Sequence, residues 1–91
     1  MAAPSQRLDK WLFFTRIFKS RSLAQTAIEE GRVWVDGKSS VKCSDQIKPG
    51  DKVVVAQGNR HRWLVVLAPG ERRGPAPEAA TLYAEEGAGE V

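Results

Sequence analysis

The spacing of apolar residues predicts a helix over residues 7–19. Within this segment apolar side chains recur every three or four positions, which is the period of an amphipathic helix. Phe13 and Ile17 fall roughly opposite the main apolar face. This helix therefore needs a second covering segment in addition to the main core.

A second helix is predicted over residues 21–30. Either Ser20 or Ser22 can supply its N-cap, because a serine hydroxyl accepts a hydrogen bond from a free backbone N–H. Gly31 suits the position just beyond the helix, since glycine tolerates a positive φ. The two helices should form a tight pair, because only a residue or two separates them. The buried stripe of the second helix is expected to contain Leu23, Ala24, Ala27 and Ile28.

After Gly31 the apolar period falls to two, which predicts antiparallel strands. Asp36-Gly37 and Gly58-Asn59 are typical two-residue hairpin turns, and Pro49-Gly50 suits the centre of a type II turn. Trp34 and Trp63 could each stack on a base, although burial or packing across strands is favoured over that role. The strands are expected over residues 32–35, 38–41, 52–57 and 61–67.

The segment 69–91 begins with residues rich in proline and glycine and reads as a tail. Within it, residues 78–86 are predicted to form a short helix that docks on the first helix through Leu82 and Tyr83. Residues 1–6 are predicted to be a flexible start, and residues 7–68 to be the domain. The expected fold class is α+β, with a helical pair, a small curved antiparallel sheet and a C-terminal tail helix.

Length and charge narrow the class of protein further. The chain has 91 residues and a net charge of +3, which is enough for one domain with one modest core. The charge is uneven: residues 1–63 hold twelve Lys/Arg and six Asp/Glu, whereas residues 64–91 hold two and five. A basic body attracts polyanions, and nucleic acid is the first of these to consider.

Several classes of chemistry find no support in the sequence. His61 is the only histidine, and Cys43 is the only cysteine, so a metal site, a catalytic triad and an internal disulfide are not expected. No phosphate-binding glycine loop is present. We therefore expect a protein that is not an enzyme and needs no cofactor. The lone cysteine favours the cytoplasm, and no apolar run reaches the ~20 residues that span a membrane.

Basic residues gather around the predicted helical pair. The second helix also offers free backbone N–H groups at its N-terminus, where Lys19 and Arg21 oppose the helix dipole. A bound phosphate would relieve that conflict. The basic residues in this part of the chain are Arg7, Lys10, Arg16, Lys19 and Arg21, and Arg32 and Lys38 can extend the patch.

The order of short motifs resembles the S4 RNA-binding domain, whose helical pair is called the αL motif. The resemblance covers about residues 7–55 and rests on Arg7-Leu8-Asp9-Lys10, Ser20-Arg21, Ala24, Ile28, Gly31, Val33, Val35, Asp36-Gly37-Lys38 and Lys48-Pro49-Gly50-Asp51. Asp36 stands where the family more often has asparagine. Trp11 and the segment that contains Leu82-Tyr83 make the chain similar to the small bacterial heat-shock S4 proteins. It ends without their basic C-terminal extension.

The resemblance implies binding of structured RNA, most of all ribosomal RNA of the large subunit, with tRNA on a stalled subunit as a further partner. A role in rescuing stalled subunits or in the heat-shock response follows, and a monomer is expected. Basic side chains and Gln25 would contact phosphates or sugars, main chain near Ser20, Gly31 and Val33 would add contacts, and Asp9 would orient an arginine. The implied site comprises Arg7, Asp9, Lys10, Arg16, Lys19, Ser20, Arg21, Ala24, Gln25, Gly31, Arg32, Val33, Asp36, Gly37 and Lys38.

Two alternatives remain open from the sequence. One is a protein-interaction module whose basic face meets an acidic partner, which would bind RNA and other polyanions without preference for folded RNA. The other is an RNA-binding accessory of an RNA-modifying enzyme, which would need a partner chain to supply the catalytic domain.

Overall fold

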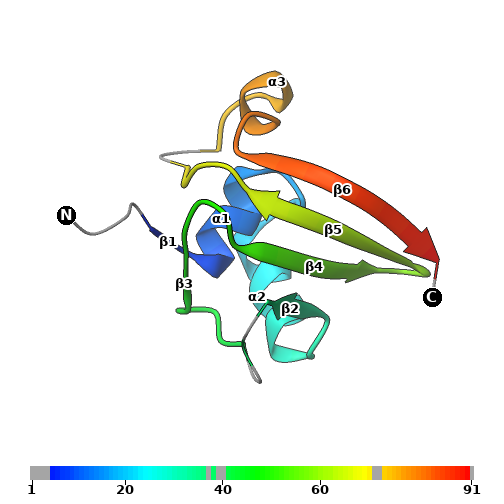
Figure 1. Ribbon diagram of the computed structural model, residues 1–91. Helices are drawn as coiled ribbons and strands as arrows, with labels where there is room; N and C mark the ends of the chain where they lie inside the picture. The colour runs from blue at the N-terminus through cyan, green and yellow to red at the C-terminus, as the bar shows by residue number, and fades with distance from the viewer. Residues whose placement is uncertain (1–4, 37, 39–40, 71–72, 91) are drawn as a thin grey trace.

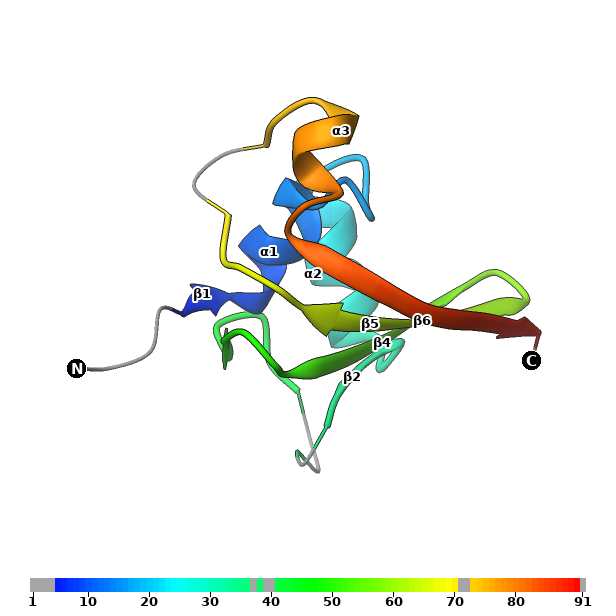
Figure 2. The same cartoon turned by 45° about the horizontal axis from the view of Figure 1, so that its top comes forward.

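The computed structural model describes residues 5–36, 38, 41–70 and 73–90. Helices α1 and α2 lie against one face of the larger sheet, and α3 stands at its edge (Figures 1 and 2). Within the described ranges, no helix is both long enough and apolar enough to cross a bilayer. The elements in chain order are β1 (Gln6–Arg7), α1 (Leu8–Phe14), α2 (Arg21–Glu29), β2 (Val33–Val35), β3 (Gln46–Ile47), β4 (Lys52–Gln57), β5 (Arg60–Val66), α3 (Ala76–Ala79) and β6 (Tyr83–Glu90).

The larger sheet has four antiparallel strands in the order β2-β4-β5-β6, and β1 and β3 form a separate pair. Alternate residues of each central strand face the helices, as the period of two predicts. The α+β fold class is therefore confirmed. The core between the layers is formed by Leu8, Trp11, Leu12, Ile17, Ala24, Ala27, Ile28, Val33, Val35, Ile47, Val53, Val55, Leu64 and Val66.

The first helix is shorter than its apolar pattern predicts. Helix α1 ends at Phe14, and Thr15, which is buried, turns its hydroxyl back onto the carbonyl oxygens of Trp11 and Leu12. The chain then reverses at Arg16, which has a positive φ of 62°. This turn brings Ile17 into the core, where it is 7% exposed. The prediction of a helix to residue 19 was wrong because periodicity alone does not locate the turn.

The second helix matches its prediction more closely. The hydroxyl of Ser20 accepts the backbone N–H of Leu23 at 3.1 Å, so Ser20 is the N-cap. Gly31 follows the helix with a φ of 76°, as expected for that position. One member of the predicted buried stripe was misplaced, because Leu23 is 51% exposed.

The β4–β5 hairpin has the predicted two-residue connection, with Gly58 at a φ of 60°. Gly50 has a φ of 96° and lies in the predicted turn before β4. The first hairpin was predicted wrongly, since β2 pairs with β4 and neither Lys38 nor Val41 belongs to a strand. The longer β4 provides β2 with a partner for all three of its residues. Gly37 lies outside the described residues.

The tail also differs from its prediction. Among the tail residues that the structure describes, Ala76–Ala79 form the one helix, and residues 83–90 form strand β6 along the edge of β5. A short isolated helix is marginal in water, whereas the free edge of β5 offers backbone partners along its length. Residues 83–90 therefore belong to the same sheet as the domain predicted to end at residue 68.

Contacts from the tail reach two aromatic residues of α1. The guanidinium of Arg73 lies 4.9 Å from the ring centre of Phe13. Tyr83 meets Trp11 edge to face at 6.5 Å between ring centres. A covering tail was expected from Leu82 and Tyr83; the described contact on Phe13 comes from Arg73, and Tyr83 packs on Trp11.

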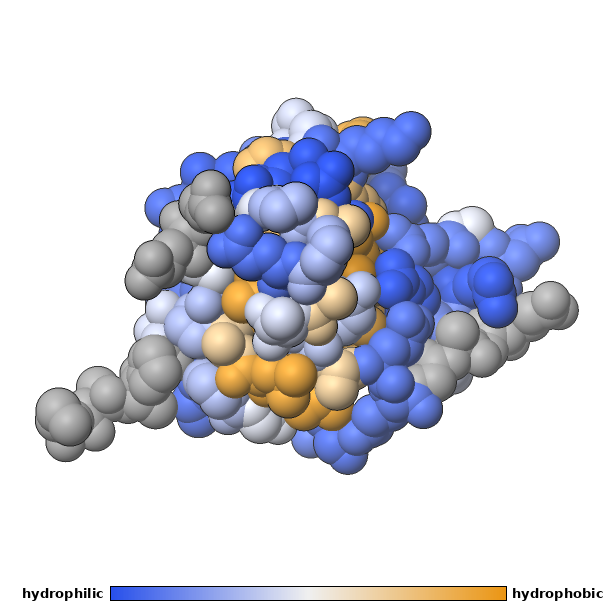
Figure 3. All heavy atoms as spheres, turned by 90° about the horizontal axis from the view of Figure 1, so that it is seen from above, coloured by the Kyte–Doolittle hydropathy of each residue, from blue (hydrophilic) through white to orange (hydrophobic). Residues whose placement is uncertain are grey.

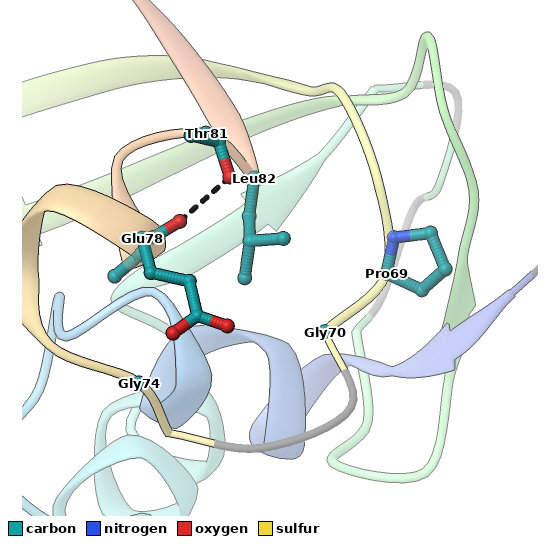
Figure 4. Close-up of a pocket in the computed structure, with 7 residues that line it drawn as sticks. Pro69, Gly70, Gly74, Glu78, Thr81 and Leu82 are labelled. Carbon is teal, nitrogen blue, oxygen red and sulfur yellow. Dashed lines mark hydrogen bonds between the residues drawn. The ribbon is translucent and has the colours of Figure 1, made fainter.

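The segment between β5 and β6 encloses a hollow of about 230 Å³ (Figure 4). Gly70 and Gly74 line it, and the side chain of Glu78 extends toward Gly74. Figure 3 looks onto the α3 end of the molecule, where hydrophobic side chains form small patches between hydrophilic ones. At the opposite end of the chain, the Gln6 side chain donates to the Gly70 carbonyl at 2.8 Å, so this part of the predicted flexible start is anchored.

Candidate nucleic-acid interface

A buried carboxylate joins the N-termini of α1 and α2. Asp9 is fully buried, and its oxygens accept hydrogen bonds from Arg7 at 3.2 Å, from Arg21 at 3.3 Å and from the Gln25 amide at 2.9 Å. The backbone N–H of Lys10 donates to the same carboxylate at 2.8 Å. We call Arg7, Asp9, Arg21 and Gln25 the Asp9 cluster.

Asp9 stays ionised within this cluster. Burial by itself raises its pKa, but the hydrogen bonds from Gln25, Arg7 and Arg21, together with the positive charge of Arg21, hold the pKa below its usual value of 3.8. One negative charge thus faces two guanidinium groups, so the cluster keeps a net positive charge. The arginine side chains remain 39% and 40% exposed and can reach a ligand.

The order of residues explains why the cluster forms here. Arg7 precedes the first helical residue, and Asp9 lies in the first turn of α1. The backbone N–H groups of Leu8 and Asp9 donate to the carbonyls of Asp45 and Cys43, which anchors this turn to the strand side of the fold. Arg21 and Gln25 are four residues apart and so lie on one face of α2. The predicted role of Asp9 as the residue that orients an arginine agrees with this geometry.

Lysines extend the basic surface from both helices. Lys10 is half-buried beside Asp9, and Lys19 is exposed just before the Ser20 N-cap of α2. In the first turn of α2 the Leu23 N–H is bonded to the Ser20 hydroxyl. Together with the Asp9 cluster, these lysines form a surface that suits phosphates.

Other predicted basic residues lie apart from the Asp9 cluster. Arg16 occupies the turn after α1, where its guanidinium donates to the Gly74 carbonyl at 2.9 Å. Arg32 forms an ion pair of 2.6 Å with Glu30. Asp36 and Lys38 are exposed beyond β2, and Gly37 between them is not described.

Buried members of the predicted site have structural roles. Ala24 is fully buried and Val33 is 2% exposed, so neither side chain faces solvent. Gly31 is exposed and carries the positive φ that ends α2. Sequence reasoning missed the link between Arg16 and Gly74, because no pattern connects residues 58 positions apart.

Comparison with known proteins settles the family. A model of the S4 domain matches residues 6–53, which is more than half of the chain and includes the whole Asp9 cluster. The chain belongs to the S4 domain family. The matched range contains β1, α1, α2, β2, β3 and the start of β4, while β5, α3 and β6 lie beyond it.

Two groups of relatives share this S4 domain. Heat shock protein 15 of Escherichia coli is 44% identical over 79 residues, which cover 87% of this chain and 59% of that protein. The chain therefore spans about three fifths of the length of that relative. The RQC P-site tRNA stabilizing factor of Bacillus subtilis is 36% identical over 85% of this chain and 87% of its own length.

The solved structure of a relative has a similar fold. Heat Shock Protein 15 of Vibrio cholerae matches with a TM-score of 0.83 and 36% identity, over 89% of this chain and 81% of that chain. That structure is described as trimeric, so the expected monomer is not confirmed for this S4 protein.

Proposed function

We propose that this protein is a non-catalytic RNA-binding factor that acts on the large ribosomal subunit. The observation that carries the proposal is the Asp9 cluster, in which one buried carboxylate holds two half-exposed arginines and an amide on a single surface. Donors fixed in this way contact phosphates and sugars at defined spacings. They recognise the shape of folded RNA more than the identity of its bases.

The names of the relatives define the setting. Relatives named heat shock protein 15 and RQC P-site tRNA stabilizing factor support action during stress on a stalled subunit that still carries tRNA. In that setting the cytoplasm is the compartment, and ribosomal RNA and tRNA are the partners. Arg7, Lys10, Lys19, Arg21 and Gln25 would provide the main contacts, and Arg16, Arg32 and Lys38 would add peripheral ones.

Sedimentation with isolated ribosomal subunits tests the proposal. The wild-type protein should travel with the large subunit and crosslink to its RNA. Arg21→Ala should reduce the bound fraction, because it removes one of the two arginines held by Asp9. The matched control is Lys48→Ala, which removes one positive charge from an exposed turn outside the cluster.

The same experiment separates the proposal from a general polyanion binder. Heparin should compete only at concentrations well above those of folded ribosomal RNA. Equal competition by heparin, or equal loss of binding for Arg21→Ala and Lys48→Ala, would show that net charge rather than the Asp9 cluster determines binding.

A further inference from the structure

The face of the larger sheet opposite α1 and α2 carries an exposed aromatic group. Trp34 is 45% exposed and Trp63 is 41% exposed, so neither is buried as predicted. The other part of that prediction, packing across strands, is confirmed, because both rings contact His61 and both residues pair with Val54 of β4. No described helix covers this face (Figure 2). Two large side chains of this kind on a solvent face suggest a binding surface.

The sheet register places these side chains together. Trp34, Val54 and Trp63 are direct neighbours across β2, β4 and β5. The ring of His61 lies 5.7 Å from that of Trp34 and 6.1 Å from that of Trp63, centre to centre. The four side chains line a hollow of about 240 Å³, which we call the tryptophan hollow.

The tryptophan hollow is shallow and open to solvent, with a volume of about 240 Å³. Ligand pockets for drug-sized molecules measure about 300–1,000 Å³ and enclose most of the ligand, so this surface suits a planar ring that lies against the indoles. The exposed parts of both indoles amount to only on the order of 200 Å², given about 150–250 Å² for a whole aromatic side chain. A stable protein interface needs about 800 Å² from each partner. A second copy of the chain or a folded protein is therefore a poor match.

Cations border the hollow on two sides. On one side, the carbonyl of Arg32 accepts the backbone N–H of Ala56, which is the cross-strand partner of His61. On the other side, Lys52 is the cross-strand partner of Val65, which follows Trp63 in β5. Both cations form ion pairs at the surface, with Glu30 and Glu86, in which every side chain is at least 44% exposed. Such exposed pairs are weak, and a phosphate can replace the glutamate. A base between two phosphates matches this pattern of an apolar centre and cationic borders.

We propose that the tryptophan hollow stacks one unpaired RNA base, as a second RNA contact on the sheet face opposite the helices. The inference rests on the proposed RNA binding. It adds that part of the bound RNA is single-stranded and contacts the sheet face. The surface exposed in the hollow is mostly apolar, so stacking here should tolerate any base. The flanking phosphates would lie toward Arg32 and Lys52.

NMR of the indole N–H groups in the full chain tests this directly. The probe is a five-residue oligoadenylate RNA, and its matched control is a ribose-phosphate oligomer of equal length without bases. The oligoadenylate should shift the Trp34 and Trp63 signals, and the abasic oligomer should not. Trp11 is an internal reference, because it is buried and donates to the Ala68 carbonyl.

Substitutions give the second arm of the test. Trp34→Ala and Trp63→Ala should each weaken oligoadenylate binding by roughly 5- to 150-fold, the range that corresponds to the loss of one base–aromatic stack. Trp34→Phe should restore part of the affinity, which separates stacking from misfolding. Leu67→Ala is the control, since it shortens a 48% exposed apolar side chain outside the hollow and should leave affinity unchanged.

Three outcomes would overturn the proposal: no shift at Trp34 and Trp63, equal shifts with the abasic oligomer, or shifts that follow protein concentration without RNA. The last outcome would show that a second copy covers this face. The proposed function is judged separately, because binding of ribosomal subunits depends on Arg21 in that experiment and the stacking test does not use it.

Discussion

At the scale of single residues, Asp9 shows how one buried charge organises a surface. A buried carboxylate is costly unless it is paired and hydrogen-bonded, and here three side chains and one backbone N–H meet that requirement. In return, the side chains of Arg7, Arg21 and Gln25 lose conformational freedom. Arg7 and Arg21 are thus oriented before a ligand arrives, which lowers the entropic cost of binding.

Asp9→Asn should lower the free energy of unfolding by about 1–3 kcal/mol at pH 7, because it replaces the charged acceptor of three side chains while leaving the arginines in place. Binding of ribosomal RNA should weaken in parallel, since Arg7 and Arg21 lose their common anchor. Urea unfolding and filter binding measure the two effects. Asp36→Asn is the matched control, because Asp36 is exposed.

The effect of Asp9 on stability should depend on pH. The pKa of Asp9 is lower in the folded protein than in the unfolded chain, so its stabilisation is present above the unfolded value of about 3.9 and is lost as the pH falls through the folded value. The free energies of unfolding of the wild type and Asp9→Asn, measured in urea at each pH, should therefore differ most near neutral pH and converge below about pH 4. If the difference in the free energy of unfolding stayed constant across this pH range, the lowered pKa of Asp9 would be contradicted.

At the scale of elements, the segment from β5 to β6 holds the helical layer in place. A Cβ atom added at Gly70 would lie 2.8 Å from a ring carbon of Phe14 and 3.0 Å from a methyl carbon of Leu82. Glycine is required here by close packing rather than by a positive φ. Arg16 and Arg73 add contacts from the same segment to the end of α1.

Gly70→Ala should lower the free energy of unfolding by about 1–3 kcal/mol, because the methyl group overpacks the contact with Phe14. Gly70→Val should lower the free energy of unfolding further, because a larger side chain meets the same contact. A loss that increases with side-chain size serves as the control. Thermal and urea unfolding measure both variants. An unchanged free energy of unfolding for Gly70→Ala would mean that this segment moves away from α1 at little cost.

Truncation after Gly74 should destabilise the whole sheet. It removes α3 and β6, uncovers the edge of β5 and takes away the contact between Tyr83 and Trp11. An exposed strand edge invites pairing with another chain, so the truncated protein should melt at a lower temperature and self-associate. Thermal melting and sedimentation measure these effects. An equal melting temperature and a clean monomer would show that β6 is dispensable.

At the scale of the whole molecule, charge is divided between two parts of the fold. The body up to residue 63 is basic, and the last 28 residues carry five glutamates and two arginines. Glu85 in β6 is paired with Arg62 at 2.9 Å, and this pair lowers the pKa of the carboxyl. The described ion pairs of this acidic strand are thus with cations of the sheet, Arg62 and Lys52.

Binding of ribosomal RNA should depend strongly on salt. If about five phosphates are neutralised, log K should fall with log salt at a slope of roughly −3.5 to −4.5. Arg21→Ala should reduce the size of this slope by about 0.7–0.9, as expected for one lost phosphate contact. Titrations at several salt concentrations measure it. An unchanged slope would place Arg21 outside the RNA contact.

Local features of this protein were determined by the sequence itself. A serine cap on α2, the φ values of Gly31, Gly50 and Gly58 and the β4–β5 hairpin all followed from neighbouring residues, because caps and turns depend on local backbone chemistry. The choice of Ser20 over Ser22 as the cap came from the structure. The S4 motifs included Arg7, Asp9 and Arg21, whereas the bond from Gln25 to Asp9 came only from the structure.

Only the tertiary structure decided the remaining features, since they depend on competition between distant partners. Strand β2 pairs with β4 instead of its own return segment, and residues 83–90 form a strand because β5 has a free edge. Helix α1 ends at Phe14 so that Ile17 can enter the core. Trp34 lies between the buried Val33 and Val35, and Trp63 precedes the buried Leu64, so both indoles lie on the other face of the sheet, where no described layer covers them.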